Sequence, residues 1–100
     1  MGCGMRRAAR KDRNHNEITA VFQKAGFRVW DTSQLGGGFP DIIIARNKST
    51  GVVEIKDGKL KPSARRLTLD ETCFRIHWET HGRWYLVASV DDALNVIEEW

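Results

Sequence analysis

The chain has 100 residues, of which 41% are hydrophobic and 29% are charged, and its formal net charge is +3. At this length we expect one domain with one hydrophobic core and no separate regulatory module. The composition is that of a globular domain rather than of a disordered tail. The longest apolar run, residues 42–45, is too short to cross a bilayer, and no apolar signal-peptide core follows the basic start. We therefore expect an intracellular protein with no membrane partner.

Basic residues gather in two places, which makes a polyanionic partner plausible, although solvated surface charge is the simpler alternative. Residues 1–13 are expected to form a flexible basic arm ahead of a single domain at 14–100. The candidate nucleic-acid-binding residues are Arg6, Arg7, Arg10, Lys11 and Arg13 in the arm, and Lys59, Lys61, Arg65 and Arg66 in a later loop.

The two cysteines, Cys3 and Cys73, are too few for a disulfide framework, and we expect Cys73 in the core. Cys73, His77 and His81 follow one another at i+4 spacing, which would align them on one helix face. They lack a fourth zinc ligand, so ordinary packing is the favoured interpretation.

In chain order, the first expected element is a helix over about residues 14–25, in which Asn14 and Glu17 form a capping box. Gly26 ends it, and residues 27–30 read as a strand. A loop with three consecutive glycines follows. Residues 41–45 and 52–56 then form a hairpin around a turn at 46–51. The helix over residues 14–25 is predicted from apolar residues spaced i, i+3, i+4 and i+7, which are Ile18, Val21, Phe22 and Ala25.

The second half is expected to begin with a basic loop that closes at Pro62. Thr68 and Glu71 form a capping box that starts a helix, and Gly82 ends that helix. Residues 84–88 form a fourth strand, and Ser89 with Asp92 caps a last helix. The order αβββαβα predicts an α/β fold, a mixed sheet flanked by helices. The inward-facing residues of the two helices are expected to be Cys73, Phe74, Trp78, Ala93, Leu94 and Ile97.

Three ionisable side chains are expected to converge on the hairpin. Glu54 and Lys56 are two apart on one strand and therefore share a face. Antiparallel pairing places Asp41 opposite one of them, with Cβ atoms roughly 5 Å apart. Two carboxylates so close repel unless a cation neutralises them, and oxygen ligands favour Mg²⁺ or Mn²⁺. Lys56 would then deprotonate a water or stabilise transition-state charge, and both roles stay open.

Each of these residues alone has a simpler interpretation. Glu54 and Lys56 would serve as an exposed strand pair, Asp41 as a strand-entry residue after Pro40, and Glu17 only as a helix cap. Glu17, however, lies about 90° from the centre of the apolar stripe of its helix, where a side chain reaches the edge of the sheet.

The segments 38–41 (Gly-Phe-Pro-Asp) and 54–56 (Glu-Ile-Lys) together resemble the PD-(D/E)xK nuclease signature on two adjacent strands. The preceding helix, the glycines and the Leu67-Thr68-x-x-Glu71-x-x-Phe74 segment make the chain most similar to the virus-type replication-repair nucleases (VRR-NUC), over roughly residues 14–97.

The resemblance implies a restriction-endonuclease-like αβββαβ core that uses magnesium or manganese. It implies that Glu17, Asp41, Glu54 and the backbone carbonyl of Ile55 bind metal beside Lys56. It also implies a homodimer, similar to the Holliday-junction resolvases, acting on branched DNA in replication or repair, in the cytoplasm of a bacterium or of a virus-infected cell.

Two residues are accessory candidates, Glu71, which stands where the family usually has Gln, and Ser33. Two other functions stay open. One is a non-catalytic nucleic-acid-binding module on a nuclease fold, and the other is a sequence-specific restriction-type endonuclease, for which the chain is short.

Overall fold

The structure is a computed structural model that describes residues 11–100, and the candidates Cys3, Arg6, Arg7 and Arg10 lie outside the described residues. The order of helices and strands is the expected αβββαβα, with one short 3-10 helix added. The elements are α1 (His15–Lys24), β1 (Arg28–Asp31), β2 (Ile42–Arg46), β3 (Ser49–Ile55), the 3-10 helix η1 (Pro62–Arg65), α2 (Leu69–Trp78), β4 (Arg83–Val87) and α3 (Val90–Glu99).

The four strands form one mixed sheet in the order β1-β2-β3-β4. The β1–β2 and β2–β3 pairs are antiparallel, whereas β3 and β4 are parallel and are connected through α2. The β2–β3 hairpin turns through Asn47 and Lys48, which both have positive φ angles of 53° and 67°. This two-residue turn is shorter than the expected 46–51, because β3 begins at Ser49. Its register pairs Ile42 with Val53.

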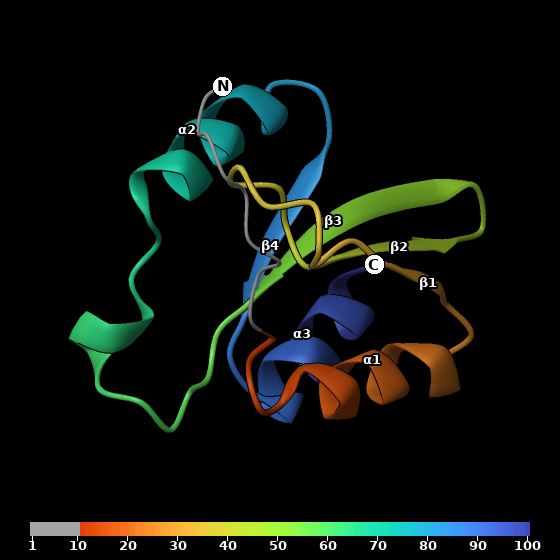
Figure 1. Cartoon of the computed structure of the whole chain (residues 1–100). Helices are drawn as coiled ribbons and strands as arrows, with labels where there is room; N and C mark the ends of the chain where they lie inside the picture. The colour runs from red at the N-terminus through yellow and green to blue at the C-terminus, as the bar shows by residue number, and fades with distance from the viewer. Residues whose placement is uncertain (1–10) are drawn as a thin grey trace.

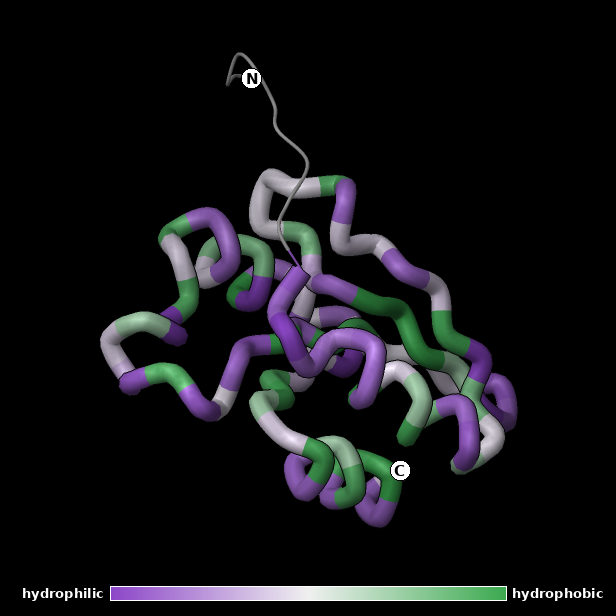
Figure 2. The backbone as a smooth tube through the Cα atoms, turned by 60° about the horizontal axis from the view of Figure 1, so that its bottom comes forward, coloured by the Kyte–Doolittle hydropathy of each residue, from purple (hydrophilic) through white to green (hydrophobic). Residues whose placement is uncertain are grey.

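The helices lie on both faces of the sheet (Figure 1), with α1 and α3 on one face and α2 on the other. The main core fills the space between the sheet and the α1–α3 pair, and Figure 2 shows the hydrophobic stretches of the strands that supply it. In contrast, α2 has no buried residue. The face of the sheet that α2 covers, which carries Glu54, is therefore covered more loosely than the face under α1 and α3. The core residues are Ile18, Phe22, Phe27, Ile42, Ile44, Val53, Ile55, Val87, Ala93 and Val96.

Two of the three expected caps are confirmed. Thr68 and Glu71 form a full capping box at α2, and the Ser89 hydroxyl accepts a hydrogen bond from the Asp92 amide at α3. The cap at α1 was wrong, because the Asn14 side chain makes no capping bond. Its amide nitrogen instead donates to the carbonyl oxygens of Lys56 and Ala88, both at 3.1 Å.

Two expected core residues are also exposed. Cys73 is exposed on α2, a helix that buries none of its side chains fully. Leu94 is 49% exposed, and Val96 occupies the core position on α3 instead. No helix within residues 11–100 combines the length and the hydrophobicity that crossing a membrane requires.

Candidate active site

The hairpin brings Asp41 and Glu54 together. Asp41 immediately precedes β2, and its amide donates to the Val53 carbonyl at 3.0 Å, which extends the β2–β3 ladder by one step. Its carboxylate accepts a 2.7 Å hydrogen bond from the Ile55 amide. Glu54 is 4% exposed and lies in hydrogen-bonding contact with Asp41. The structure therefore places these two carboxyl groups side by side on one face of the hairpin, as the strand pairing predicts.

Lys56 follows β3 and connects the hairpin to α2. Its Nζ lies 3.7 Å from Oε2 of Glu54 and 2.9 Å from Oε1 of Glu71. The same Glu71 oxygen accepts the Thr68 amide at 2.8 Å as part of the capping box. The first turn of α2 is thus tied to the end of β3 by one carboxylate with two functions.

The site carries more negative charge than its one lysine balances. Burial, together with the charges of Asp41 and Glu71, raises the pKa of Glu54 to about 10. Burial also raises the pKa of Asp41, although the Ile55 amide opposes this. For Lys56, burial alone would lower the pKa, but the hydrogen bond and charge of Glu71 and the charge of Glu54 raise it. Without a cation, the site therefore holds a protonated Glu54 beside a lysine ammonium at neutral pH.

These side chains open into a pocket of about 390 Å³. Its far wall is the glycine loop, in which Gly36, Gly37 and Gly38 all have positive φ angles. A Cβ on Gly38 would stand 2.4 Å from the Asp70 carbonyl oxygen, so only glycine allows this loop to touch α2 so closely. The lining residues are Asp12, Ser33, Gly36, Gly37, Gly38, Phe39, Asp41, Glu54, Lys56, Thr68, Asp70 and Glu71.

Both accessory candidates line this pocket, but they differ in what they contact. Glu71 binds Lys56 directly. Ser33 is 2% exposed, and its hydroxyl donates to Asp31 at 2.6 Å, while its amide donates to the same carboxylate. Ser33 therefore fixes the start of the glycine loop and has its hydroxyl proton engaged there.

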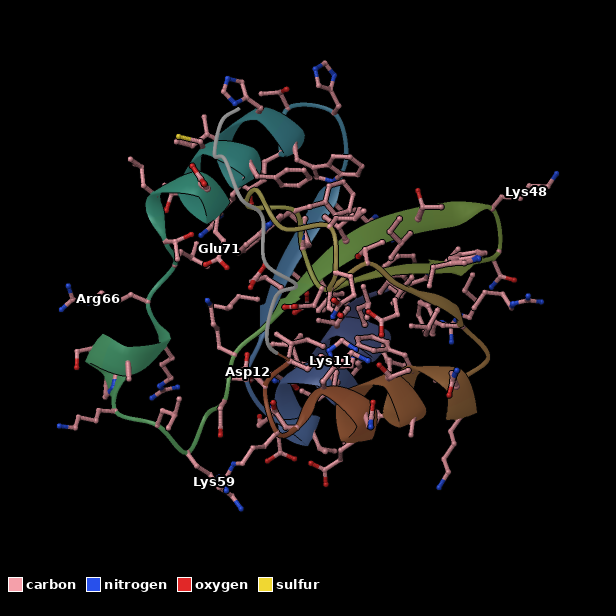
Figure 3. The ribbon with its side chains drawn as sticks, viewed as in Figure 1. Lys11, Asp12, Lys48, Lys59, Arg66 and Glu71 are labelled. Carbon is pink, nitrogen blue, oxygen red and sulfur yellow. The ribbon has the colours of Figure 1, made fainter. Side chains whose placement is uncertain are left out.

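Glu17 is not brought into this group. It is exposed on α1 and lines a different pocket, beside Asp57 and Ser89. The acidic residue that does reach the site from this end of the chain is Asp12, just before α1 (Figure 3). Sequence reasoning missed Asp12 because it stands among basic residues and outside any strand or helix pattern.

The basic candidates fall into two classes. Lys11 and Arg13 are paired with Asp31 and Asp57, at 2.7 and 3.0 Å. Figure 3 shows Lys59 and Arg66 extending outward from the β3–α2 connection. Within residues 11–100, no ion pair involves the loop residues Lys59, Lys61, Arg65 and Arg66.

One solved structure, described as a VRR_NUC domain, superposes on this chain with a TM-score of 0.69. The match covers 93% of this chain and 99% of that chain, at 21% sequence identity. The chain has the VRR_NUC fold. The resemblance inferred from the motif is thereby confirmed at the level of fold. No family model and no curated protein matches the chain by sequence.

The residues of this VRR_NUC fold suit a hard divalent cation in their chemistry. The buried carboxyl group of Glu54, the half-buried one of Asp41 and a third on α2 offer oxygen ligands. The pKa of Glu54 is raised by burial and by the negative charges of Asp41 and Glu71, and a cation would neutralise those charges. Within residues 11–100, no three His, Cys, Asp or Glu side chains already form a metal-ligand cluster. Ligation by Glu54 would require its carboxyl group to lose its proton. The Ile55 main chain adjoins the site through its amide.

Proposed function

We propose that the chain is a divalent-metal-dependent endonuclease that hydrolyses phosphodiester bonds in DNA. The observation that carries this proposal is the meeting of Asp41, Glu54 and Lys56 in one pocket, on and directly beside the two adjacent strands β2 and β3. The VRR_NUC fold supports it.

In the proposed mechanism, Asp41 and Glu54 would hold Mg²⁺ or Mn²⁺, and the Ile55 carbonyl would be a further ligand. The bound cation would supply a polarised phosphodiester and a water of lowered pKa. Lys56, kept as an ammonium by Glu71 and Glu54, donates to a non-bridging phosphate oxygen and stabilises the negative charge that grows there. The glycine loop lets the DNA backbone approach without side-chain hindrance.

The four basic residues of the β3–α2 loop that have no ion-pair partner within residues 11–100 supply phosphate contacts that do not depend on base sequence. They are Lys59, Lys61, Arg65 and Arg66. Few residues lie outside the core to read base edges, so selectivity for DNA shape, such as a branch or a junction, is favoured over selectivity for sequence. A homodimer that binds two strands is part of this proposal, and sedimentation of the full chain with and without a four-way junction tests it.

Replacement of Lys56 by alanine is the decisive test of the activity. Lys56→Ala should reduce cleavage by about 10²-fold to 10⁴-fold, because the transition-state charge loses its cationic partner. Affinity for DNA should change little. The measurement is cleavage of labelled single-stranded, duplex, flap and four-way-junction DNA, with Mg²⁺ and with Mn²⁺.

The surface lysine Lys48, on the hairpin turn far from the site (Figure 3), provides the matched control, because Lys48→Ala removes the same charge. Undiminished cleavage by Lys56→Ala would exclude the mechanism. Binding without cleavage of any substrate would favour the non-catalytic module, and incision at one fixed sequence would favour the restriction-type enzyme.

A further inference from the structure

We propose that Asp12 is the acidic residue that the N-terminal end of the chain contributes to the cation site, in place of Glu17. This inference rests on the proposed nuclease function and assigns a residue that the sequence motif does not mark.

The first argument is position. Asp12 lines the same pocket as Asp41, Glu54 and Lys56. Its carboxyl group interacts with the charges of the other members, because burial and Asp41 raise the pKa of Asp12 while Lys56 lowers it. Glu17 lies further along the chain, on α1, and lines the neighbouring pocket instead.

The second argument is that the backbone around Asp12 is held from several sides. Lys11 is paired with Asp31 at 2.7 Å and Arg13 with Asp57 at 3.0 Å, so the residues on either side of Asp12 are each anchored to the sheet or its loop. The Asp12 carbonyl oxygen accepts the His15 amide at 3.0 Å. These contacts fix the segment at the mouth of the pocket, which limits the entropy lost when the Asp12 carboxylate engages a ligand.

The third argument is that no residue of the described part of the chain engages the Asp12 carboxylate. Within the described part of the chain, its side chain takes part in no ion pair and no hydrogen bond, although Lys11 and Arg13 beside it are both paired. A carboxylate that is partly buried, has no ion-pair partner among residues 11–100 and shares a pocket with Asp41 and Glu54 is unfavourable without a cation. A divalent cation that keeps part of its water shell can use such a group directly or through a bound water.

The test compares two charge-removing substitutions in the full chain. Asp12→Asn should weaken Mn²⁺ binding by about tenfold or more, the effect of losing one supporting ligand. Glu17→Gln, which removes the same charge on α1, should leave Mn²⁺ affinity within about twofold of the wild type. Isothermal titration with Mn²⁺ alone gives this readout independently of cleavage, and thermal melting without metal checks that each variant folds.

Asp41→Asn separates the failure of this inference from that of the proposed function. If Asp41→Asn weakens Mn²⁺ binding and Asp12→Asn does not, Asp12 has no role at the cation and only this inference is overturned. If Glu17→Gln weakens binding instead, the assignment returns to Glu17. If the wild type binds no Mn²⁺, or Asp41→Asn has no effect, the proposed function fails as well.

Discussion

Glu54 illustrates a conflict between stability and the proposed chemistry at the scale of one side chain. It is 4% exposed, beside Asp41 and Glu71, with a single lysine close by. The folded chain therefore keeps this carboxyl group protonated far above its ordinary pKa of 4.5, up to about 10. A residue chosen only for stability would not be ionisable at this position, which supports a role in holding a cation.

The sign of this effect leads to a prediction about stability and pH. A carboxyl group whose pKa is raised by folding binds more protons in the folded state, so stability falls as the pH rises from about 4.5 toward 10. Glu54→Gln removes this penalty. In the presence of EDTA the variant should be more stable than the wild type at pH 8, by roughly 1 kcal/mol or more, which corresponds to about 4–8 °C in Tm per kcal/mol.

Thermal unfolding of both proteins at pH 4 and pH 8 measures this difference. At pH 4 the two should melt at nearly the same temperature, because the glutamate is then mostly protonated whether the chain is folded or unfolded. A variant that is less stable than the wild type at pH 8 would contradict the raised pKa. The same variant should have lost cleavage activity, since a neutral amide is a poor ligand for the cation.

Glu71 bears on the two roles that the sequence left open for Lys56 in the proposed mechanism. The hydrogen bond at 2.9 Å and the negative charges around it raise the pKa of Lys56, so the ammonium form dominates. This favours charge stabilisation over deprotonation of water. The sequence could mark Glu71 as a departure from the family's usual Gln, but only the structure reveals that its carboxylate serves the helix cap and Lys56 together.

At the scale of elements, the glycine loop depends on contact with α2. Gly38 has a φ of 88°, and a Cβ there would lie 2.4 Å from the Asp70 carbonyl oxygen. Gly37, next to it, has a φ of 63°, but a Cβ there would meet no atom within 4 Å. An alanine at either position would therefore be strained by the positive φ angle, but only an alanine at position 38 would also clash with α2.

Gly38→Ala should destabilise the fold by more than Gly37→Ala. Left-handed backbone strain alone costs an L residue roughly 1–2 kcal/mol, and the clash at position 38 adds to it. Because the clash would displace the first turn of α2, and with it Glu71, cleavage should also fall further in Gly38→Ala. Urea unfolding and single-turnover cleavage of both variants test this. Equal effects of the two substitutions would mean that the loop does not need its contact with α2.

The elements themselves were largely predictable, because each depends on a local pattern. The hairpin follows from two β-rich segments around a short polar turn, and the α2 capping box follows from Thr68 and Glu71 three residues apart. What failed depends on tertiary contacts. Asn14 has the right spacing for a cap, but its amide bonds two carbonyl groups that are 42 and 74 residues away along the chain.

The residues that line the candidate site also divide into those that local patterns predict and those that depend on tertiary contacts. Asp41, Glu54 and Lys56 were predictable because strand periodicity and hairpin register are enough to bring them together. Asp12 was not, because its place depends on the ion pairs of Lys11 and Arg13 with residues far along the chain. A residue in an irregular segment carries no periodicity from which its direction can be read.

At the scale of the whole molecule, positive charge without ion-pair partners lies on the β3–α2 connection, beside the pocket. Lys59 and Arg66 point outward from it (Figure 3) and have no ion-pair partner within residues 11–100. Contacts of such residues with phosphates would release counterions, so in the proposed function they would contribute to both the affinity for DNA and its dependence on salt.

Removing Lys59 and Arg66 together should therefore weaken DNA binding and flatten its dependence on salt. For two lost phosphate contacts, the slope of log K against log salt should decrease by about 2, at roughly 0.9 per contact on duplex DNA. The double variant Lys24→Ala/Lys48→Ala removes the same charge from exposed positions at the end of α1 and on the hairpin turn. It should keep nearly the wild-type slope. Fluorescence anisotropy from about 50 to 200 mM salt, with a junction and with a duplex of equal length, measures both slopes. Equal slopes for the two double variants would mean that the β3–α2 connection is not the DNA-binding surface, whatever the pocket beside it does.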